Sequence, residues 1–285
     1  MTNDTLAPPE PPTPQQPSPQ QSSTVRSGTR ALAITIGVLG GGILLLGGAA
    51  AAIGAVGSTI FSASGGSGSA SVPVNGVDSL RVDVGDGDVD VAFGSGSEAR
   101  LDYESNIGEW RFERDGDTLV VSSPQQWFGF FDWAGEQRAT LVLPESLEGI
   151  DADLDVSAGS LMVDGTFGEV AYDLSAGNIE LEGSATALDA EMSAGRSTVE
   201  LADVETATFN VSAGNVYGEL TGEAPQAIGI DLAAGSIELQ VPDVPYRTVI
   251  DRAAGSVDTN LQESRDSRRT IDVDVSAGNV TLAAG

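Results

Sequence analysis

Residues 151–164, DADLDVSAGSLMVD, contain the pattern that decides the fold of this chain. A triplet of small residues, Ser157-Ala158-Gly159, separates two segments in which apolar and polar residues alternate. The triplet recurs as Ser-Ala-Gly or Ala-Ala-Gly at spacings of 18 to 23 residues. Its first residue, which we call the anchor, is Ser157, Ser175, Ser193, Ser212, Ala233, Ala253 or Ser276.

Alternation on both sides of the triplet predicts two short strands in each unit. A period of two buries one face of a strand, and glycine permits a tight corner because it tolerates a positive φ. The position three residues before the anchor holds Leu154, Tyr172, Ala190, Phe209, Ile230, Ile250 and Val273. The position one residue before it holds Val156, Leu174, Met192, Val211, Leu232, Arg252 and Val275. The position two residues after the glycine holds Leu161, Ile179, Ser197, Val216, Ile237, Val257 and Val280.

Units of this size cannot bury an apolar face alone, but stacked units share one core. A diverged copy at Val82–Val91, with Gly85 as its anchor, brings the number of units to eight. Residues 93–150 interrupt the series with strand and turn signals that predict hairpins. We therefore expect an all-β fold, a β-solenoid of about eight short coils with a hairpin insertion. The lack of a six-residue internal repeat, which a left-handed hexapeptide helix would have, favours a right-handed or irregular coil.

The N-terminal part of the sequence predicts a membrane anchor. Residues 1–30 are rich in Pro and Gln, which predicts a disordered tail. Residues 31–57 contain only apolar residues, Gly and Thr, and as a helix would span about 40 Å, enough to cross a bilayer. Arg26 and Arg30 precede this segment, so the tail is expected in the cytoplasm and the rest outside a single-pass span of the cell membrane.

Residues 58–71 are expected to form a Gly/Ser linker, and residues 72–285 the extracytoplasmic domain. A cleaved signal peptide is the alternative, because Ser62-Ala63-Ser64 offers a processing site; the long leader and long apolar run disfavour it. Gly37 and Gly41 have GxxxG spacing, through which two transmembrane helices could associate.

Composition excludes several classes of function. The chain has 285 residues, 42 Asp and Glu against 13 Arg, a formal net charge of −29, and neither His nor Cys. Without imidazole or thiol there is no His base, no Cys nucleophile, no disulfide and no common zinc site. The acidic surface repels phosphate backbones, so nucleic acid is not an expected partner.

Three segments give the chain a family resemblance. They are Val82–Val91, the run Asp117-Thr118-Leu119-Val120-Val121, and Ala139-Thr140-Leu141-Val142-Leu143-Pro144 leading into the repeats. In these the chain resembles the bacterial putative-adhesin family of β-strand-repeat domains of unknown function. The resemblance covers about residues 72 to 285 and implies a membrane-tethered envelope protein with a presumed role in adhesion. Related domains accompany envelope-stress regulators, and the resemblance implies no catalytic residues.

One polar position in the repeat is acidic in seven of eight units. It lies two residues before the anchor and holds Asp83, Asp155, Asp173, Glu191, Asn210, Asp231, Asp251 and Asp274. In register, these side chains would form a column about 4.8 Å apart that could collect Ca²⁺ or a cationic envelope component. The alternative is a solvated face that keeps the domain soluble and discourages strand-to-strand aggregation. No other cofactor is expected.

Two further features could bind partners. Trp127, Phe128, Phe130, Phe131 and Trp133 form an aromatic cluster that could be an exposed loop for lipid, sugar or protein, or could cap the first coil. The strand expected at residues 280–285 ends the chain without a cap. Its free edge could pair with a second copy or another partner, or could simply fray.

These observations favour a non-enzymatic, membrane-anchored surface protein that acts as an adhesin or binding module. Its expected partners are the membrane, crossed once, and an envelope polymer or a surface protein. Enzymatic activity is disfavoured because a glycosidase needs two carboxyl groups in unlike environments, whereas these acids recur uniformly. The alternative function is an envelope-stress signalling component acting through a membrane signalling protein.

Overall fold

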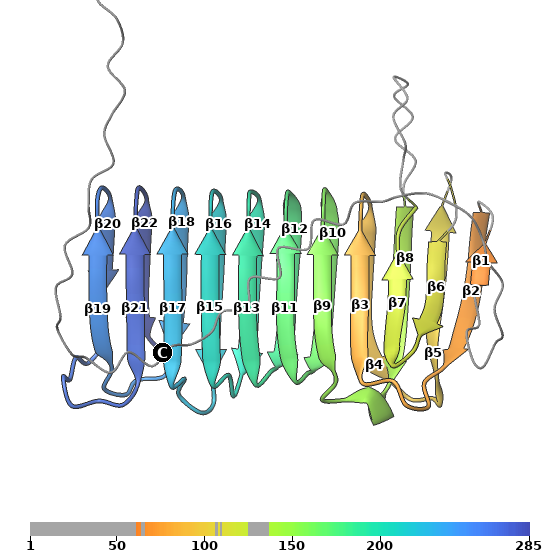
Figure 1. The fold of residues 1–285 in the computed structure, drawn as a ribbon, viewed down its shortest axis with the longest axis horizontal. Coiled ribbons are helices and arrows are strands. Elements are labelled where there is room, and N and C mark those ends of the chain that lie inside the picture. The colour runs from red at the N-terminus through yellow and green to blue at the C-terminus, as the bar shows by residue number, and fades with distance from the viewer. Residues whose placement is uncertain (1–60, 64–65, 106–107, 109, 125–136) are drawn as a thin grey trace, which may run out of the picture. The chain divides into compact units, whose positions relative to one another are not determined.

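The computed structural model describes residues 61–63, 66–105, 108, 110–124 and 137–285 of the chain. In these residues the fold is all-β, as the alternation predicts, with two 11-stranded sheets that enclose one hydrophobic core. Successive strands of each sheet lie side by side (Figure 1). A single turn of 3-10 helix, η1 (Glu145–Leu147), precedes the regular repeats.

The first sheet contains the strand that precedes the corner in each repeat. Its strands, in spatial order, are β1 (Phe61–Ala63), β6 (Trp110–Asp115), β7 (Thr118–Ser122), β3 (Ser79–Val84), β9 (Asp151–Val156), β11 (Glu169–Leu174), β13 (Ala187–Met192), β15 (Thr206–Val211), β17 (Ala227–Leu232), β21 (Thr270–Val275) and β19 (Arg247–Arg252).

The second sheet contains the strand that follows the corner. In spatial order these strands are β2 (Gly66–Pro73), β5 (Glu98–Ser105), β8 (Gln137–Pro144), β4 (Asp88–Gly94), β10 (Gly159–Thr166), β12 (Gly177–Ser184), β14 (Arg196–Ala202), β16 (Asn215–Thr221), β18 (Ser236–Val241), β22 (Asn279–Ala284) and β20 (Ser256–Thr259).

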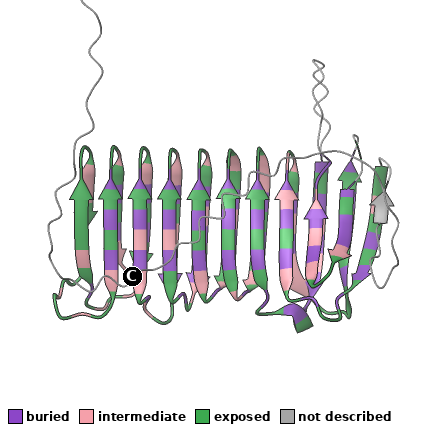
Figure 2. Cartoon of the chain, viewed as in Figure 1, coloured by how far each residue is buried: buried purple, intermediate pink, exposed green. Residues whose placement is uncertain are grey.

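The repeats stack in parallel and in register. Leu154 of β9 aligns with Tyr172 of β11, and Leu161 of β10 aligns with Ile179 of β12. These positions are buried, whereas the residues between them face solvent, and Figure 2 shows the resulting bands of buried and exposed residues. The strand–corner–strand unit that the alternation predicts is therefore confirmed in each repeat.

The glycines of the triplets form a column at the corners. Gly177 has a φ of +104°, and a Cβ atom built on it would lie 2.1 Å from the carbonyl oxygen of Gly159 in the preceding repeat. No side chain fits so close to a neighbouring backbone. The repeated glycine thus serves both the left-handed turn and the close approach of successive corners.

The interruption between the first two repeats extends both sheets. β7 pairs in parallel with β3, and β8 pairs in parallel with β4. Outside this layer the hairpin prediction is confirmed for β6 and β7, which follow each other in the chain and pair antiparallel. β5 instead pairs antiparallel with β2 and with β8, and β6 and β7 separate β5 from β8 in the chain. The residues between β7 and β8, numbers 125–136, lie outside the described part of the chain.

The expected flexible linker is wrong for residues 66–71. These residues belong to β2, which pairs antiparallel with β5 along its whole length. Gly68 lies against the ring of Tyr103, and a Cβ atom there would be 2.2 Å from the Tyr103 hydroxyl. Gly68, one of the small residues that suggest a linker, is required by this close packing.

The last two repeats stack in the reverse of their chain order, which sequence reasoning did not anticipate. β21 pairs with β17 on one side and β19 on the other, and β22 lies in the same way between β18 and β20. The expected free edge at residues 280–285 is therefore wrong, because β22 has a neighbour on both sides. The strands at this end of the sheets are β19 and β20.

The reversed order has a physical reason in the inward positions of β19. Thr248 and Arg252 align with the buried Ile271 and Val275 of β21. If the repeats stacked in chain order, Arg252 would lie inside the core, and burial of an unpaired charge is strongly unfavourable. At the end of the stack Arg252 is exposed, so the polar repeat caps the apolar ones.

The loop between β20 and β21 makes this exchange possible. It runs back past the start of β19, where the Tyr246 amide donates to the Gln262 carbonyl and the Ser264 amide donates to the Tyr246 carbonyl. Leu261 and Tyr246 are buried beneath it. The chain thus passes around the terminal repeat before it returns to form the inner one.

No helix in the described residues is long and apolar enough to cross a bilayer. Residues 31–57, where the sequence predicts the transmembrane helix, and residues 1–30 lie outside the described part.

Candidate functional site

The acidic position of the repeat forms a column on the outer face of the first sheet. Each member aligns with the equivalent residue of the next strand. The spatial order is Asp83, Asp155, Asp173, Glu191, Asn210, Asp231, Asp274 and Asp251. The predicted in-register column is confirmed, although the reversed repeats exchange Asp274 and Asp251.

Electrostatic strain in this column is greatest at its N-terminal end. Partial desolvation raises the pKa of Asp83. Partial desolvation, followed by repulsion from Asp83, Asp173 and Asp153, raises the pKa of Asp155, and a hydrogen bond from Ser157 opposes this shift. Both carboxylates would gain from a cation or from protonation.

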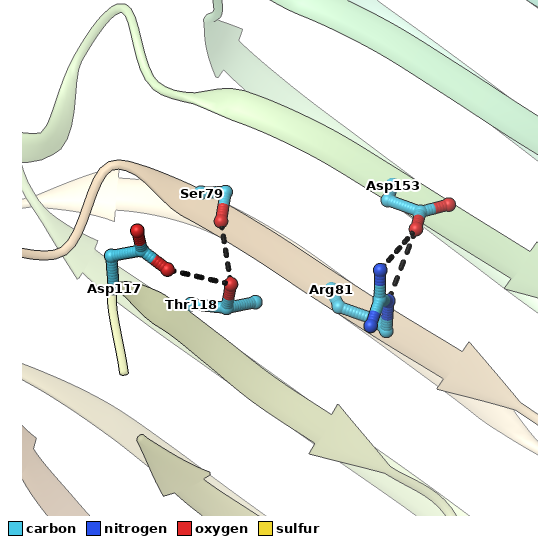
Figure 3. Close-up of polar contacts among 5 residues, drawn as sticks. All are labelled: Ser79, Arg81, Asp117, Thr118 and Asp153. Carbon is cyan, nitrogen blue, oxygen red and sulfur yellow. Dashed lines mark hydrogen bonds and ion pairs between the residues drawn. The ribbon is translucent and has the colours of Figure 1, made fainter. Parts of the chain in front are cut away.

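The guanidinium group near the N-terminal end of the acidic column pairs with a carboxylate outside that column. Arg81 points at Asp153 of the neighbouring strand, with its Nη2 atom 2.9 Å from Oδ2 (Figure 3). In the same view, the hydroxyl groups of Ser79 and Thr118 lie 2.8 Å apart and the Thr118 hydroxyl donates to Asp117. Arg81 and Asp153 belong to the column beside the acidic one, so this ion pair leaves the charge of Asp83 and Asp155 uncompensated.

The geometry of the acidic column does not enclose a cation. Among the described residues, no three or more Asp, Glu, His or Cys side chains gather closely enough to hold a metal ion. The carboxylates instead stand in a single row, each beside the next. Calcium binding at Asp155, Asp173, Glu191, Asp231, Asp251 and Asp274 stays a prediction.

A second acidic column lies on the outer face of the other sheet, and sequence reasoning missed it. Its members are aligned in register on β10, β12, β14 and β16. They are Asp164, Glu182, Glu200 and Glu219. Each stands seven residues after its anchor, so the repeat template that revealed the first column contained the signal for the second.

A shallow groove of about 670 Å³ lies beside this second column, across β4, β10, β12 and β14, with Arg138 of the neighbouring strand β8 at one end. Its charged side chains are Asp88, Asp90, Arg138, Glu180 and Arg196. The Arg138 Nη2 atom lies 3.3 Å from Asp88 Oδ2. Three carboxylates and two guanidinium groups give the groove a nearly balanced charge within a strongly acidic protein.

The uncharged lining of the groove offers hydrogen-bonding groups and one apolar side chain. Ser160, Asn178 and Thr198 contribute hydroxyl and amide groups, and Met162 is 46% exposed. The Asn178 amide donates to the Ser160 hydroxyl over 3.5 Å, which is a weak hydrogen bond. Tyr217, 40% exposed, aligns with Thr198 on the next strand.

The predicted aromatic site falls outside the part of the chain that the structure describes. Trp127, Phe128, Phe130, Phe131 and Trp133 all lie outside the described residues. Their role as a binding loop or as a cap stays a prediction. The groove is formed by residues from strands far apart in the sequence, and only the register of the second sheet brings them together.

No protein-family model matches the chain, and no curated protein does. Among solved structures, the chain is similar to a putative cell adhesion protein from Clostridium sporogenes, with 15% identity, a TM-score of 0.34, and coverage of 77% of this chain and 100% of that one. It is also similar to a putative adhesin from Bacteroides fragilis, with 13% identity, a TM-score of 0.35, and coverage of 77% and 98%. At these TM-scores neither likeness bears on the function of this chain.

Proposed function

We propose that this chain is a non-enzymatic surface protein of the cell envelope whose β-domain binds an envelope polymer or another surface protein. In this proposal residues 31–57 hold it in the membrane with a single span, and residues 72–285 form a right-handed β-solenoid outside. The observation that carries the proposal is the in-register repetition of outward-facing side chains across both sheets. Such a face offers an extended partner the same contact at every strand.

The chemistry of the described residues supports presentation of a surface over catalysis. Apart from the partly desolvated Asp83 and Asp155, the carboxylates of the two columns stand in rows on exposed faces, and the sequence supplies no His or Cys. General acid–base catalysis by two carboxyl groups depends on environments that separate their pKa values. The proposed protein therefore acts by adhesion or retention of a partner.

Binding to envelope material tests this function directly. The full-length chain would be reconstituted into lipid nanodiscs and mixed with isolated envelope fragments from the cells that produce it. We expect it to sediment with the fragments, whereas empty nanodiscs and an unrelated single-pass protein of similar net charge should stay in solution. The absence of sedimentation above these controls would contradict the proposal.

Cross-linking in intact cells identifies which kind of partner is present. Recovery of wall polymer or an exposed surface protein supports the binding module. Recovery of a membrane kinase or an anti-sigma-type protein alone would instead support the signalling alternative. The two outcomes differ in the chemistry of the recovered partner, so one experiment separates them.

A further inference from the structure

The groove across β4, β10, β12 and β14 combines features that point to one chemical class of ligand. Its walls alternate acceptors and donors: the carboxylate of Glu180, the amide of Asn178 and the guanidinium of Arg196. Each of these groups can bind a hydroxyl, which is donor and acceptor at once. A ligand with hydroxyl groups on both edges fits this lining better than an apolar peptide, which would leave the polar groups unpaired.

The charge of the groove argues against a strongly charged ligand. Asp90 and Glu180 would repel a polyanion, as would the net charge of −29. Arg138 and Arg196 bring the charge of the lining close to zero, so the groove itself offers a polycation little attraction. A neutral polymer is the class that a nearly balanced lining suits.

Apolar surface beside the groove suits the carbon–hydrogen face of a sugar ring. Met162 and Tyr217 stand exposed on the outer face, on strands β10 and β16. Thr198 lines the groove, and Tyr217 is aligned with it on the next strand. Tyr217 therefore stands one strand beyond the groove, in the same outward row as Met162 and Thr198. Tyrosine combines an apolar ring face with a hydroxyl, which favours amphipathic ligands such as sugars.

The dimensions of the site favour a chain over a single sugar. The four neighbouring strands, about 4.8 Å apart, place the outer two about 14 Å from each other, and Arg138 of β8 extends the lining by one more strand. The same outward position recurs at each strand, as Ser160, Asn178 and Arg196. A linear polymer lying across the strands would meet one of these polar groups at every step.

We infer that this groove is a binding site for a neutral polysaccharide, which lies across β4, β10, β12 and β14 and packs a sugar ring on Tyr217. The inference rests on the proposed binding function and names the surface and the ligand class. It assigns Asn178 and Arg196 to hydrogen bonding with sugar hydroxyls, and Met162 and Tyr217 to contact with the sugar rings.

Affinity electrophoresis of the detergent-solubilised full-length chain tests this site. The probes are two neutral polymers, dextran and hydroxyethyl cellulose, and two charged ones, polygalacturonate and chitosan. We expect at least one neutral polymer to retard the chain. The retardation should change little when salt rises to about 0.5 M, because salt screens interactions between charges and leaves contacts with a neutral polymer almost unaffected. Retardation by neither neutral polymer would overturn the inference, as would retardation by charged polymers alone.

Variants of exposed residues locate the site without disturbing the core. Asn178→Ala and Tyr217→Ala should each weaken retardation about fivefold, the change expected for the loss of one hydrogen bond or one ring contact. Asn279→Ala is the matched control, because Asn279 occupies the same position of the repeat on β22, outside the groove. Equal retardation of the Asn178 and Asn279 variants would overturn the assignment to this groove. If the Asn178 and Asn279 variants are retarded equally while the unmodified chain sediments with envelope fragments, the general binding function stands and only the groove is excluded.

Discussion

The hydroxyl groups of Tyr172 and Ser197 lie 2.7 Å apart in the core and join the two sheets by a hydrogen bond. Tyr172 belongs to β11 of the first sheet and Ser197 to β14 of the second. Ser197 occupies an inward position that holds apolar residues in the flanking strands. The two residues compensate each other, since each satisfies a polar group that would otherwise be buried alone.

Removal of one partner should cost more than removal of both. Tyr172→Phe should lower the free energy of unfolding by about 1–3 kcal/mol, because it leaves the Ser197 hydroxyl buried and unpaired. Ser197→Ala should act similarly on Tyr172. In chemical denaturation of the full-length chain, the double variant should lose less than the sum of the single losses. Additive losses would show that the bond contributes no coupling.

Alkaline pH should also act through Tyr172. Burial raises the pKa of this tyrosine from 10.0 to about 12, and its hydrogen bond with Ser197 opposes the shift. Because the folded pKa is raised, its stabilising contribution is complete below pH 10 and is lost between about pH 10 and 12. Melting temperatures measured across this range should fall more steeply for the unmodified chain than for Tyr172→Phe. Identical slopes would mean that other groups control alkaline unfolding.

The glycine column should tolerate no side chain at the corners. Gly177→Ala places a Cβ atom against the carbonyl of Gly159 at a positive φ, so we expect a loss of at least about 2 kcal/mol of stability. Gly229→Ala is the control within the same domain, because the nearest atom to its added Cβ is 4.0 Å away. Thermal unfolding should therefore separate the two variants, and equal melting temperatures would contradict the packing described for the corner.

The strands and corners could be predicted from the sequence because each depends on residues close together in the chain. A period of two in hydrophobicity predicts which residues of a strand are buried, and the repeated glycine predicts the position of the turn. The order of the last repeats depends instead on which unit can end the stack. Arg252 stands at a position that is apolar in the other repeats, and this was the local sign that its repeat ends the stack. To infer the reversed order from Arg252, one must compare two alternative stacking orders of the last repeats. The groove could not be predicted for another reason, since it depends on the side-by-side alignment of strands from five separate segments of the sequence.

The acidic column should make the chain more stable at mildly acidic pH. The pKa values of Asp83 and Asp155 are raised in the folded state, so their contribution is absent at pH 7, returns as the pH falls through the folded pKa and is complete below 3.8. The melting temperature should therefore rise as the pH falls from 7 toward the folded pKa values of these two carboxyl groups. Asp155→Asn should raise the melting temperature by about 1–3 °C at pH 7 and should reduce the further rise that acidification produces.

Glu238→Gln separates this local repulsion from the effect of net charge. Glu238 also faces solvent, but its in-register neighbours are Tyr217 and Thr281, so its removal relieves no aligned carboxylate. Differential scanning calorimetry of both variants should show a gain for Asp155→Asn and little change for Glu238→Gln. Equal gains would assign the effect to total charge.

The polar terminal repeat should keep the stack from growing end to end. Ile250 is 38% exposed at the last layer, flanked by the inward Thr248 and the exposed Arg252. Thr248→Val with Arg252→Val would give this layer the apolar inward face of an internal repeat, next to the edge of β19 that pairs with no other described strand. Sedimentation velocity should then show association that increases with concentration, beyond that of the unmodified chain. Arg247→Val is the control, because it removes a charge from the outward face of the same strand. Association of the control variant to the same degree would contradict a capping role for the inward residues.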